Sequence, residues 1–313
     1  MAVGVHLEEL AHRLAARLAQ DERVVGVLLL GSVAQEQAWR RSDLDLLVIV
    51  DGERAEQAPP LLVTQIEGVP AQVEWITLDA FLGEHRERAP LRSHLALGAR
   101  AYARVLVDRT GQISDALSRA RTFPETTREA FRLIYIGWAG HAIHAAEQYL
   151  ALSRPEVAVT WARRALDEAG RLALVEQGVY PTKAWQLQLE RVRPDLHADY
   201  VILVSQAGDA EAVCRRILGR VNAELECSLP ACARFVRGAF EGWPGPLALP
   251  QLISRLQTAC QIEFGRALGP AAWGLVEQLV QRGVLAQHQR CAEFPTRGSG
   301  IIFDEIVYAP AGG

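Results

Sequence analysis

Two aspartates that stand two residues apart, Asp43 and Asp45, begin a segment that is otherwise aliphatic, Asp43–Val50. The alternation of acidic and aliphatic residues predicts a β-strand, on which residues two apart point to the same face. Two carboxylates this close repel each other unless a cation lies between them, and unpaired charge among apolar side chains is costly. Mg²⁺ prefers hard oxygen ligands and keeps waters and phosphate oxygens in its shell. The pair therefore predicts a magnesium site.

A Gly-Ser pair and a third acid accompany the aspartates. Gly31 and Ser32 follow the apolar run Val24–Leu30, a predicted strand, and ten residues separate them from Asp43. Gly31 has no Cβ to keep a phosphate away from the backbone, and Ser32 adds a hydroxyl near the start of a predicted helix. Glu74 lies between apolar neighbours on a predicted adjacent strand, so it is free to face the same edge. Together these residues predict a site for a metal-bound triphosphate.

Three carboxylates suit displacement at phosphorus. Two bound metal ions, about 3.5–4 Å apart, can neutralise the leaving pyrophosphate and hold the nucleophile. The sequence contains no Gly-x-Ser-x-Gly, which disfavours a serine hydrolase, and no Gly-x-x-x-x-Gly-Lys-Ser/Thr, which disfavours a P-loop kinase.

The order of these motifs resembles the DNA polymerase β-like nucleotidyltransferase superfamily. The shared pattern is a hydrophobic strand, Gly-Ser, about ten residues, Asp-hydrophobic-Asp-hydrophobic and later hydrophobic-Glu-hydrophobic, all within Val24–Leu78. Within the superfamily, the chain looks like the kanamycin and streptomycin/spectinomycin adenylyltransferases, antibiotic-resistance enzymes that join this core to a helical bundle.

The resemblance implies an activity and a role for each motif. The activity is transfer of a nucleoside monophosphate, AMP from ATP or another nucleoside triphosphate, to a hydroxyl of a small aminoglycoside-like acceptor, with release of pyrophosphate. Gly31 and Ser32 would bind the triphosphate, with the Ser32 hydroxyl on its β- and γ-phosphates. Asp43 and Asp45 would bind Mg²⁺, with two ions expected. Glu74 would be a third metal ligand or the base that deprotonates the acceptor.

Two cationic residues are candidates for binding the nucleotide. Arg41, next to Arg40, directly precedes Ser42-Asp43, where it could contact a phosphate or lie in a solvated loop. Lys183 is the one lysine among 33 basic residues and stands at the start of a predicted helix. It resembles the bundle-borne cation that reaches the triphosphate in some family members, and the alternative is a surface lysine.

Two acids are candidates for binding the acceptor. Glu147 shares a predicted helix face with His141, His144 and Gln148, and it resembles the acid that the helical domain supplies in the kanamycin enzymes. The alternative is a solvated helix face. Asp167 could recognise a cationic substrate.

The patterning predicts an α+β protein with three parts. Residues 1–110 form the nucleotidyltransferase core, an α/β unit with a mixed sheet in which Leu61–Ile66 and Ala71–Leu78 make a hairpin. Residues 111–228 are predicted to form an acceptor-binding helical bundle. Residues 229–313 are predicted to form an α+β tail, whose role the sequence does not indicate. The tail has the order helix, helix, strand, loop, strand, which is winged-helix-like; the alternative is a cap over the bundle. The predicted bundle helices are Ala130–Leu152, Glu156–Gly178, Lys183–Val192 and Asp209–Leu225.

Composition limits the partners and the compartment. With 50% hydrophobic and 22% charged residues, the chain is expected to be globular. Its net charge of −4 does not favour nucleic acid as a partner. Five cysteines without a Cys-x-x-Cys pair disfavour a zinc site or disulfide framework. No apolar run reaches 18 residues and the N-terminus lacks the order of a secretory signal, so we expect a cytoplasmic protein with no membrane partner.

Two other functions stay open at this stage. A toxin–antitoxin type of nucleotidyltransferase would act on a protein or a tRNA and would need an open, basic cleft. A nucleotide-sensing regulator would bind DNA through the tail, where residues 229–300 contain seven arginines and four acids. Neither the acceptor, the nucleobase nor the oligomeric state follows from the sequence.

Overall fold

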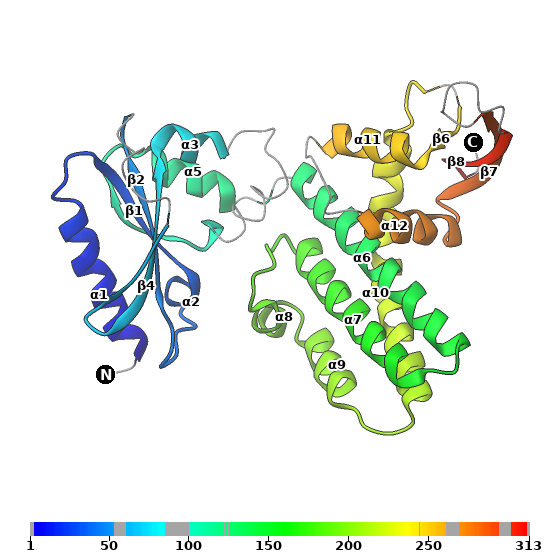
Figure 1. The fold of residues 1–313 in the computed structure, drawn as a ribbon, viewed down its shortest axis with the longest axis horizontal. Coiled ribbons are helices and arrows are strands. Elements are labelled where there is room, and N and C mark those ends of the chain that lie inside the picture. The colour runs from blue at the N-terminus through cyan, green and yellow to red at the C-terminus, as the bar shows by residue number, and fades with distance from the viewer. Residues whose placement is uncertain are drawn as a thin grey trace. The chain divides into compact units, whose positions relative to one another are not determined.

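The computed structural model describes residues 3–52, 61–84, 100–121, 123, 125–243, 245–260, 269–293 and 302–311. The chain divides into two compact units, Met1–Phe123 and Pro124–Gly313 (Figure 1). The first unit contains a mixed sheet with helices, and the second contains long helices followed by a small sheet. This confirms the predicted α+β class. The finer division at residues 110 and 228 stays a prediction.

The first unit is built on a five-stranded sheet with the order β3-β4-β2-β1-β5. β2 and β4 are parallel and the other neighbouring pairs are antiparallel, so the sheet is mixed as predicted. β3 and β4 form the predicted hairpin through Glu67 and Gly68, both of which have positive φ. The strands are β1 (Val24–Leu30), β2 (Leu44–Val50), β3 (Leu61–Ile66), β4 (Val69–Thr77) and β5 (Arg104–Asp108).

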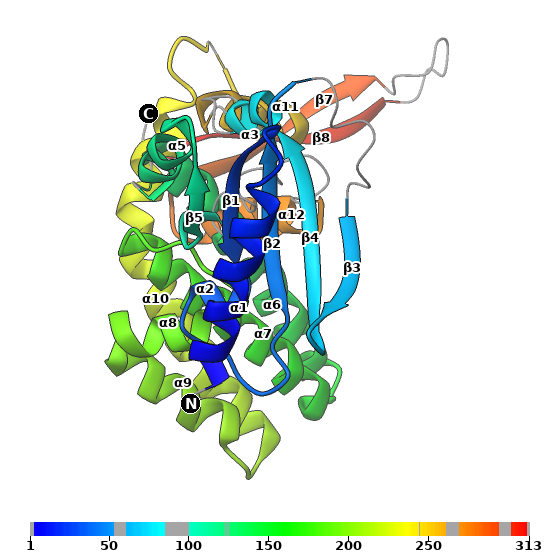
Figure 2. The ribbon, with the colours of Figure 1, turned by 90° about the vertical axis from the view of Figure 1, so that its left-hand side faces the viewer.

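Helices pack on both faces of this sheet. The apolar stripe of α1 (Val3–Leu18), which includes Leu7 and Leu10, packs on the face that carries Leu44 and Leu46. Figure 2 shows α1 in front of the sheet, running roughly along the strands, and β3 at the sheet edge. The opposite face packs against α3 (Leu78–Glu84) and α5 (Gln112–Arg121) through Phe81, Ile113 and Leu117. Odd and even residues of β2 therefore face different helices.

The second unit begins with the helices that the periodicity predicts and with a further helix, α9 (Pro194–Ser205), that was not predicted. Proline stands at the first position of α7 and of α9, where the missing N–H costs nothing. The bounds are α6 (Glu125–Ala151), α7 (Pro155–Glu176), α8 (Trp185–Val192), α9 (Pro194–Ser205) and α10 (Ala210–Gly238). None of the helices in the described part of the chain has the length and apolarity needed to cross a bilayer.

The prediction that the last bundle helix ends at Leu225 is wrong. α10 continues through Pro230 to Gly238 because its buried stripe continues with Ser228, Cys232 and Val236. Tertiary packing thus outweighs the cost of one helix-interior proline.

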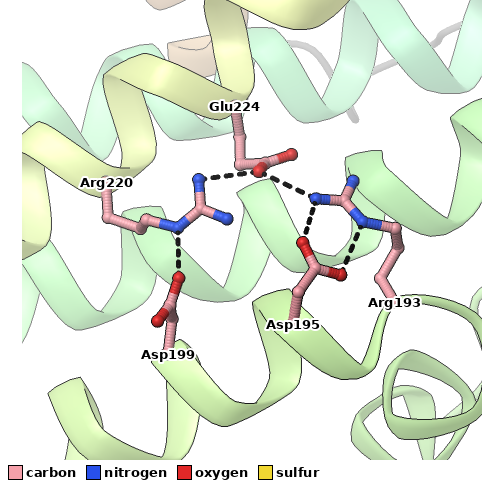
Figure 3. Close-up of polar contacts among 5 residues, drawn as sticks. All are labelled: Arg193, Asp195, Asp199, Arg220 and Glu224. Carbon is pink, nitrogen blue, oxygen red and sulfur yellow. Dashed lines mark hydrogen bonds and ion pairs between the residues drawn. The ribbon is translucent and has the colours of Figure 1, made fainter.

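An ion-pair network holds α9 against α10 (Figure 3). Arg193, between α8 and α9, contacts Asp195 at 3.0 and 2.9 Å and the Glu224 carboxylate at 3.4 Å. Arg220 contacts the same Glu224 at 2.7 Å and Asp199 on α9 at 3.0 Å. Glu224 is buried, so two arginines share one desolvated carboxylate and tie the helices together.

The C-terminal tail has the predicted order of helices and strands, with one added short strand at its start. A three-stranded sheet, in the order β6-β8-β7, accompanies two helices. The elements are β6 (Leu247–Ala248), α11 (Leu249–Cys260), α12 (Gly269–Gln281), β7 (Leu285–Glu293) and β8 (Ile302–Pro310). The predicted turn Pro295–Gly300 lies outside the described residues.

Helix α12 packs closely on α6. A Cβ at Gly140 would overlap the backbone of Gly274, and a Cβ at Gly274 would overlap the backbone of Gly137 and His141. The two helix backbones therefore approach each other directly at these glycines. This contact joins the tail to the bundle within one unit.

Candidate active site

The Gly-Ser pair follows β1 directly, where the register places Asp45 of β2 opposite Leu30. Gly31 has a φ of +68°, in the left-handed region, and a Cβ there would overlap the Asp45 carboxylate. The bare Cα of Gly31 therefore leaves room for this carboxylate, and any other residue would displace it. The helix that follows, α2 (Gly31–Ala34), has only four residues, so the expected helix N-terminus is a single turn.

Hydrogen bonds fix the loop between Ser32 and Asp43. The Ser32 hydroxyl donates to the hydroxyl of Ser42 at 3.0 Å, and the Trp39 N–H donates to the same Ser42 oxygen at 3.0 Å. Ser42 is buried directly before the first aspartate. Sequence reasoning gave no role to Ser42, although its position beside Asp43 was visible.

The two aspartates have different surroundings. Asp43 precedes β2, which begins at Leu44, and accepts a hydrogen bond of 2.7 Å from the Gln72 amide on β4. Asp45 lies within β2, where it is paired in register with Gln72. Both aspartates are half-buried.

Glu74 shares a sheet face with Asp45. In the parallel register of β2 and β4, Asp45 lies beside Gln72 and Leu47 beside Glu74. Because paired residues and residues two apart share a face, Asp45 and Glu74 project on the same side. Glu74 is exposed there.

The acids supply oxygen ligands of the type that Mg²⁺ prefers, but they do not form a complete coordination shell. Among the described residues, no group of three or more His, Cys, Asp or Glu side chains is arranged to hold a metal ion. Carboxylate oxygens nevertheless match the preference of Mg²⁺, whose shell phosphate oxygens and waters commonly complete. The donors therefore fit a metal that arrives with a triphosphate, and the metal ligands stay a prediction.

Arg100 was missed by sequence reasoning. Its side chain is buried and lies with its guanidinium carbon 5.9 Å from the centre of the Phe81 ring. Burial lowers the pKa of Arg100, and the negative charge of Glu74 opposes this shift. The charge of the third acid thus favours the charged form of this buried arginine. No local sequence pattern predicts that Arg100 lies near Glu74, because the two residues are 26 positions apart in the chain.

Arg41 and Lys183 are both exposed. Arg41 lies in the loop before Ser42, and Lys183 lies in the turn before α8, in the second unit. Neither forms an ion pair with another described residue. Their proposed contacts with phosphate stay predictions.

The two acceptor candidates lie on the first two helices of the second unit. Glu147 is exposed on α6. Asp167, on α7, is half-buried and accepts a hydrogen bond of 2.9 Å from the Tyr200 hydroxyl on α9. One carboxylate oxygen of Asp167 is thus already engaged in a hydrogen bond between α7 and α9.

Comparison with known proteins shows a similarity to solved structures. No protein-family model matches the chain, and no curated protein does. A crystal structure of a nucleotidyltransferase-like protein from Exiguobacterium sibiricum is similar, with 17% sequence identity and a TM-score of 0.59. The chain shares a nucleotidyltransferase-like fold. The similarity covers 97% of this chain and 99% of the other, so it extends beyond the motif-bearing sheet to the helical unit. It does not test the resemblance to the aminoglycoside enzymes.

Proposed function

We propose that the protein is a magnesium-dependent nucleotidyltransferase that transfers AMP, or another nucleoside monophosphate, to a hydroxyl with release of pyrophosphate. The observation that carries the proposal is the Asp45 carboxylate lying against the bare Cα of Gly31. Such packing leaves a carboxylate beside an open backbone at the end of a strand, where a metal-bound phosphate needs both an anionic ligand and close approach. The shared fold supports the same assignment.

The residues divide the work as follows. Asp43 and Asp45 would hold Mg²⁺, and Glu74 would either join them or take the proton of the acceptor hydroxyl. Bound Mg²⁺ would neutralise charge on the triphosphate and its leaving pyrophosphate. The Ser32 hydroxyl, which donates to Ser42 in this structure, would turn its one proton to a phosphate oxygen when the triphosphate binds. Arg41 and Lys183 would add positive charge near the triphosphate.

The acceptor that we propose is a small hydroxylated molecule of the aminoglycoside type. Glu147 is the better placed of the two acids, because its carboxylate is exposed whereas Asp167 holds Tyr200. A protein or tRNA acceptor is the alternative, and an acceptor panel separates the two.

The packing of α12 argues against the DNA-binding alternative. In a winged helix the second of two adjacent helices reads the DNA groove, and α12 holds that place. Ala271, Leu275 and Leu279 of α12 are fully buried, and its glycine meets α6. The exposed residues of α12 include Trp273 and Gln281, and no side chain of this helix carries the positive charge that contacts with DNA phosphates need.

An acceptor panel tests the proposal. The full chain is incubated with Mg²⁺ and each nucleoside triphosphate against aminoglycosides, bulk tRNA and test proteins, and pyrophosphate release is measured. We expect release with at least one small acceptor, and a loss of about 100-fold or more in Asp43→Asn and Asp45→Asn. Asp51→Asn, an exposed aspartate just beyond β2, is the matched control and should keep full activity. Release that persists in Asp45→Asn, or no release with any pair of substrates, would refute it.

A further inference from the structure

Two indole rings, an imidazole and a guanidinium gather on neighbouring turns of α6 and α7. Trp138 and His141 are three residues apart on α6, and Trp161 and Arg164 are three apart on α7, so each pair shares a helix face. The Arg164 guanidinium carbon lies 5.7 Å from the Trp138 ring centre and 5.6 Å from that of Trp161. The His141 ring is edge-on to both indoles, at 5.9 and 5.7 Å. We call these four residues the Trp-Arg cluster.

Arg164 differs from the other arginines that lie over tryptophan. Arg171 lies 5.0 Å from Trp185 and is paired with Glu168 at 3.0 Å. Arg255 lies 5.2 Å from Trp243 and donates to the backbone carbonyls of Ala239 and Glu241. Arg164 is exposed and, within the described residues, makes no hydrogen bond or ion pair. Its N–H donors are therefore directed to solvent.

The acids next to the Trp-Arg cluster are already engaged. Glu168, one helical turn after Arg164, pairs with Arg171 instead, and Asp167 accepts from Tyr200. Burial raises the pKa of Glu168, against the effect of Arg171 and Arg164. Burial lowers the pKa of His141, and the charges of Arg164 and His144 act in the same direction. At neutral pH the cluster thus presents one cation, a neutral imidazole and two half-buried indoles.

We propose that the Trp-Arg cluster binds a planar aromatic ligand that carries an oxyanion. The ring would pack offset or edge-on against the half-buried indoles, beside the guanidinium that lies over them. The oxyanion, a carboxylate or a phosphate, would accept two N–H bonds from Arg164, whose planar fork matches such groups. Because the guanidinium is already held over two rings, little side-chain freedom is lost on binding. The inference does not depend on the proposed transfer reaction.

Four small probes test it, each titrated into the ¹⁵N-labelled full chain while the indole N–H signals are followed by NMR. Benzoate and phenyl phosphate carry both features, benzyl alcohol has only the ring, and acetate has only the charge. The signals of Trp138 and Trp161 are assigned as those that vanish in Trp138→Phe and Trp161→Phe. We expect benzoate, phenyl phosphate or both to shift these two signals, at concentrations at least about tenfold below those that benzyl alcohol or acetate require.

Substitution of the arginine separates recognition from general attraction to a positive surface. Arg164→Gln should weaken binding of the charged aromatic probes about tenfold or more and leave benzyl alcohol unchanged. Arg154→Gln, which removes another exposed arginine of the same unit, is the control and should have no effect. A response to only one of the two anionic rings identifies the ligand as a carboxylate or a phosphate. Equal response to acetate, shifts confined to other indoles, or unchanged binding in Arg164→Gln would overturn the proposal.

Discussion

Glycine permits close contact in both units of the chain, but with different neighbours. In the first unit a carboxylate, that of Asp45, lies against Gly31. In the second unit a helix backbone lies against Gly140 and Gly274. The first contact places a charged group at a strand end, whereas the second brings two helix backbones together, with the buried Gln278 side chain beside Gly140. The same residue type therefore serves a candidate site in one unit and packing in the other, and substitutions should affect different measurements.

The largest expected effect is on stability, in Gly274→Ala. Alanine is normally favoured over glycine inside a helix, by roughly 0.5–1 kcal/mol. Here its Cβ would overlap the backbone of Gly137 and His141, so we expect the free energy of unfolding to fall by about 3 kcal/mol or more. Chemical denaturation measures this. Gly219→Ala on α10, where no described atom lies within 4 Å of the new Cβ, is the control and should be neutral or stabilising. Equal stability of the two variants would show that the close contact at Gly274 does not require glycine.

Gly31→Ala should affect activity more than stability. The positive φ costs an alanine about 1–2 kcal/mol in unfolding free energy. The displaced Asp45 carboxylate should lower pyrophosphate release about 100-fold, which corresponds to roughly 2.7 kcal/mol in the barrier. Gly68→Ala provides the matched control, because Gly68 has a φ of +82° but no described atom within 4 Å of its Cβ position. That variant should show the stability loss with full activity. Similar activity loss in both would attribute the effect to backbone strain.

The smallest expected effect is in the ion-pair network of the second unit. Hydrogen bonds from Arg193 lower the pKa of Asp195 to about 2, below its unfolded value of about 4. The ionised Asp195 therefore contributes stability that is complete above pH 4 and is lost as the pH falls toward 2. Because Asp195 is largely exposed, Asp195→Asn should cost less than about 1 kcal/mol at pH 7.

Urea denaturation of wild type and Asp195→Asn between pH 7 and pH 3 measures this difference. The gap should shrink below pH 4, and pyrophosphate release should be unchanged. A gap that stays constant to pH 3 would assign the effect to packing.

Local patterns predicted the elements, and tertiary packing decided the contacts. The strand Val24–Leu30 and the hairpin at Gly68 were predictable because alternation and turn residues act over a few positions. The end of α10 was not, because residues beyond Pro230 are held by burial against other helices. In the candidate site, Asp43 and Asp45 stand out by spacing alone. Gln72 meets Asp43 only after the sheet register is set, and Arg100 comes near Glu74 only in the folded chain, so no spacing reveals either residue.

The Trp-Arg cluster illustrates the same limit. Its two pairs, Trp138 with His141 and Trp161 with Arg164, each follow helical spacing and were visible in the sequence. The two pairs face each other only because of the relative axial position of α6 and α7, which tertiary packing sets. Helical spacing alone favours a packing role for these tryptophans, whereas the structure leaves both half-buried around an exposed arginine.

The contact between α6 and α12 also determines where this chain could be cut into fragments that fold. A fragment that ended at residue 228 would lack α12 and would uncover the glycine-lined strip of α6 on which the buried face of α12 packs. A fragment that began at residue 124 would keep both helices together. Truncation, domain exchange and gene fusion should therefore give folded proteins when the junction is near residue 124 and unfolded ones when it is near residue 228. Homologous proteins should likewise contain the bundle and the tail together.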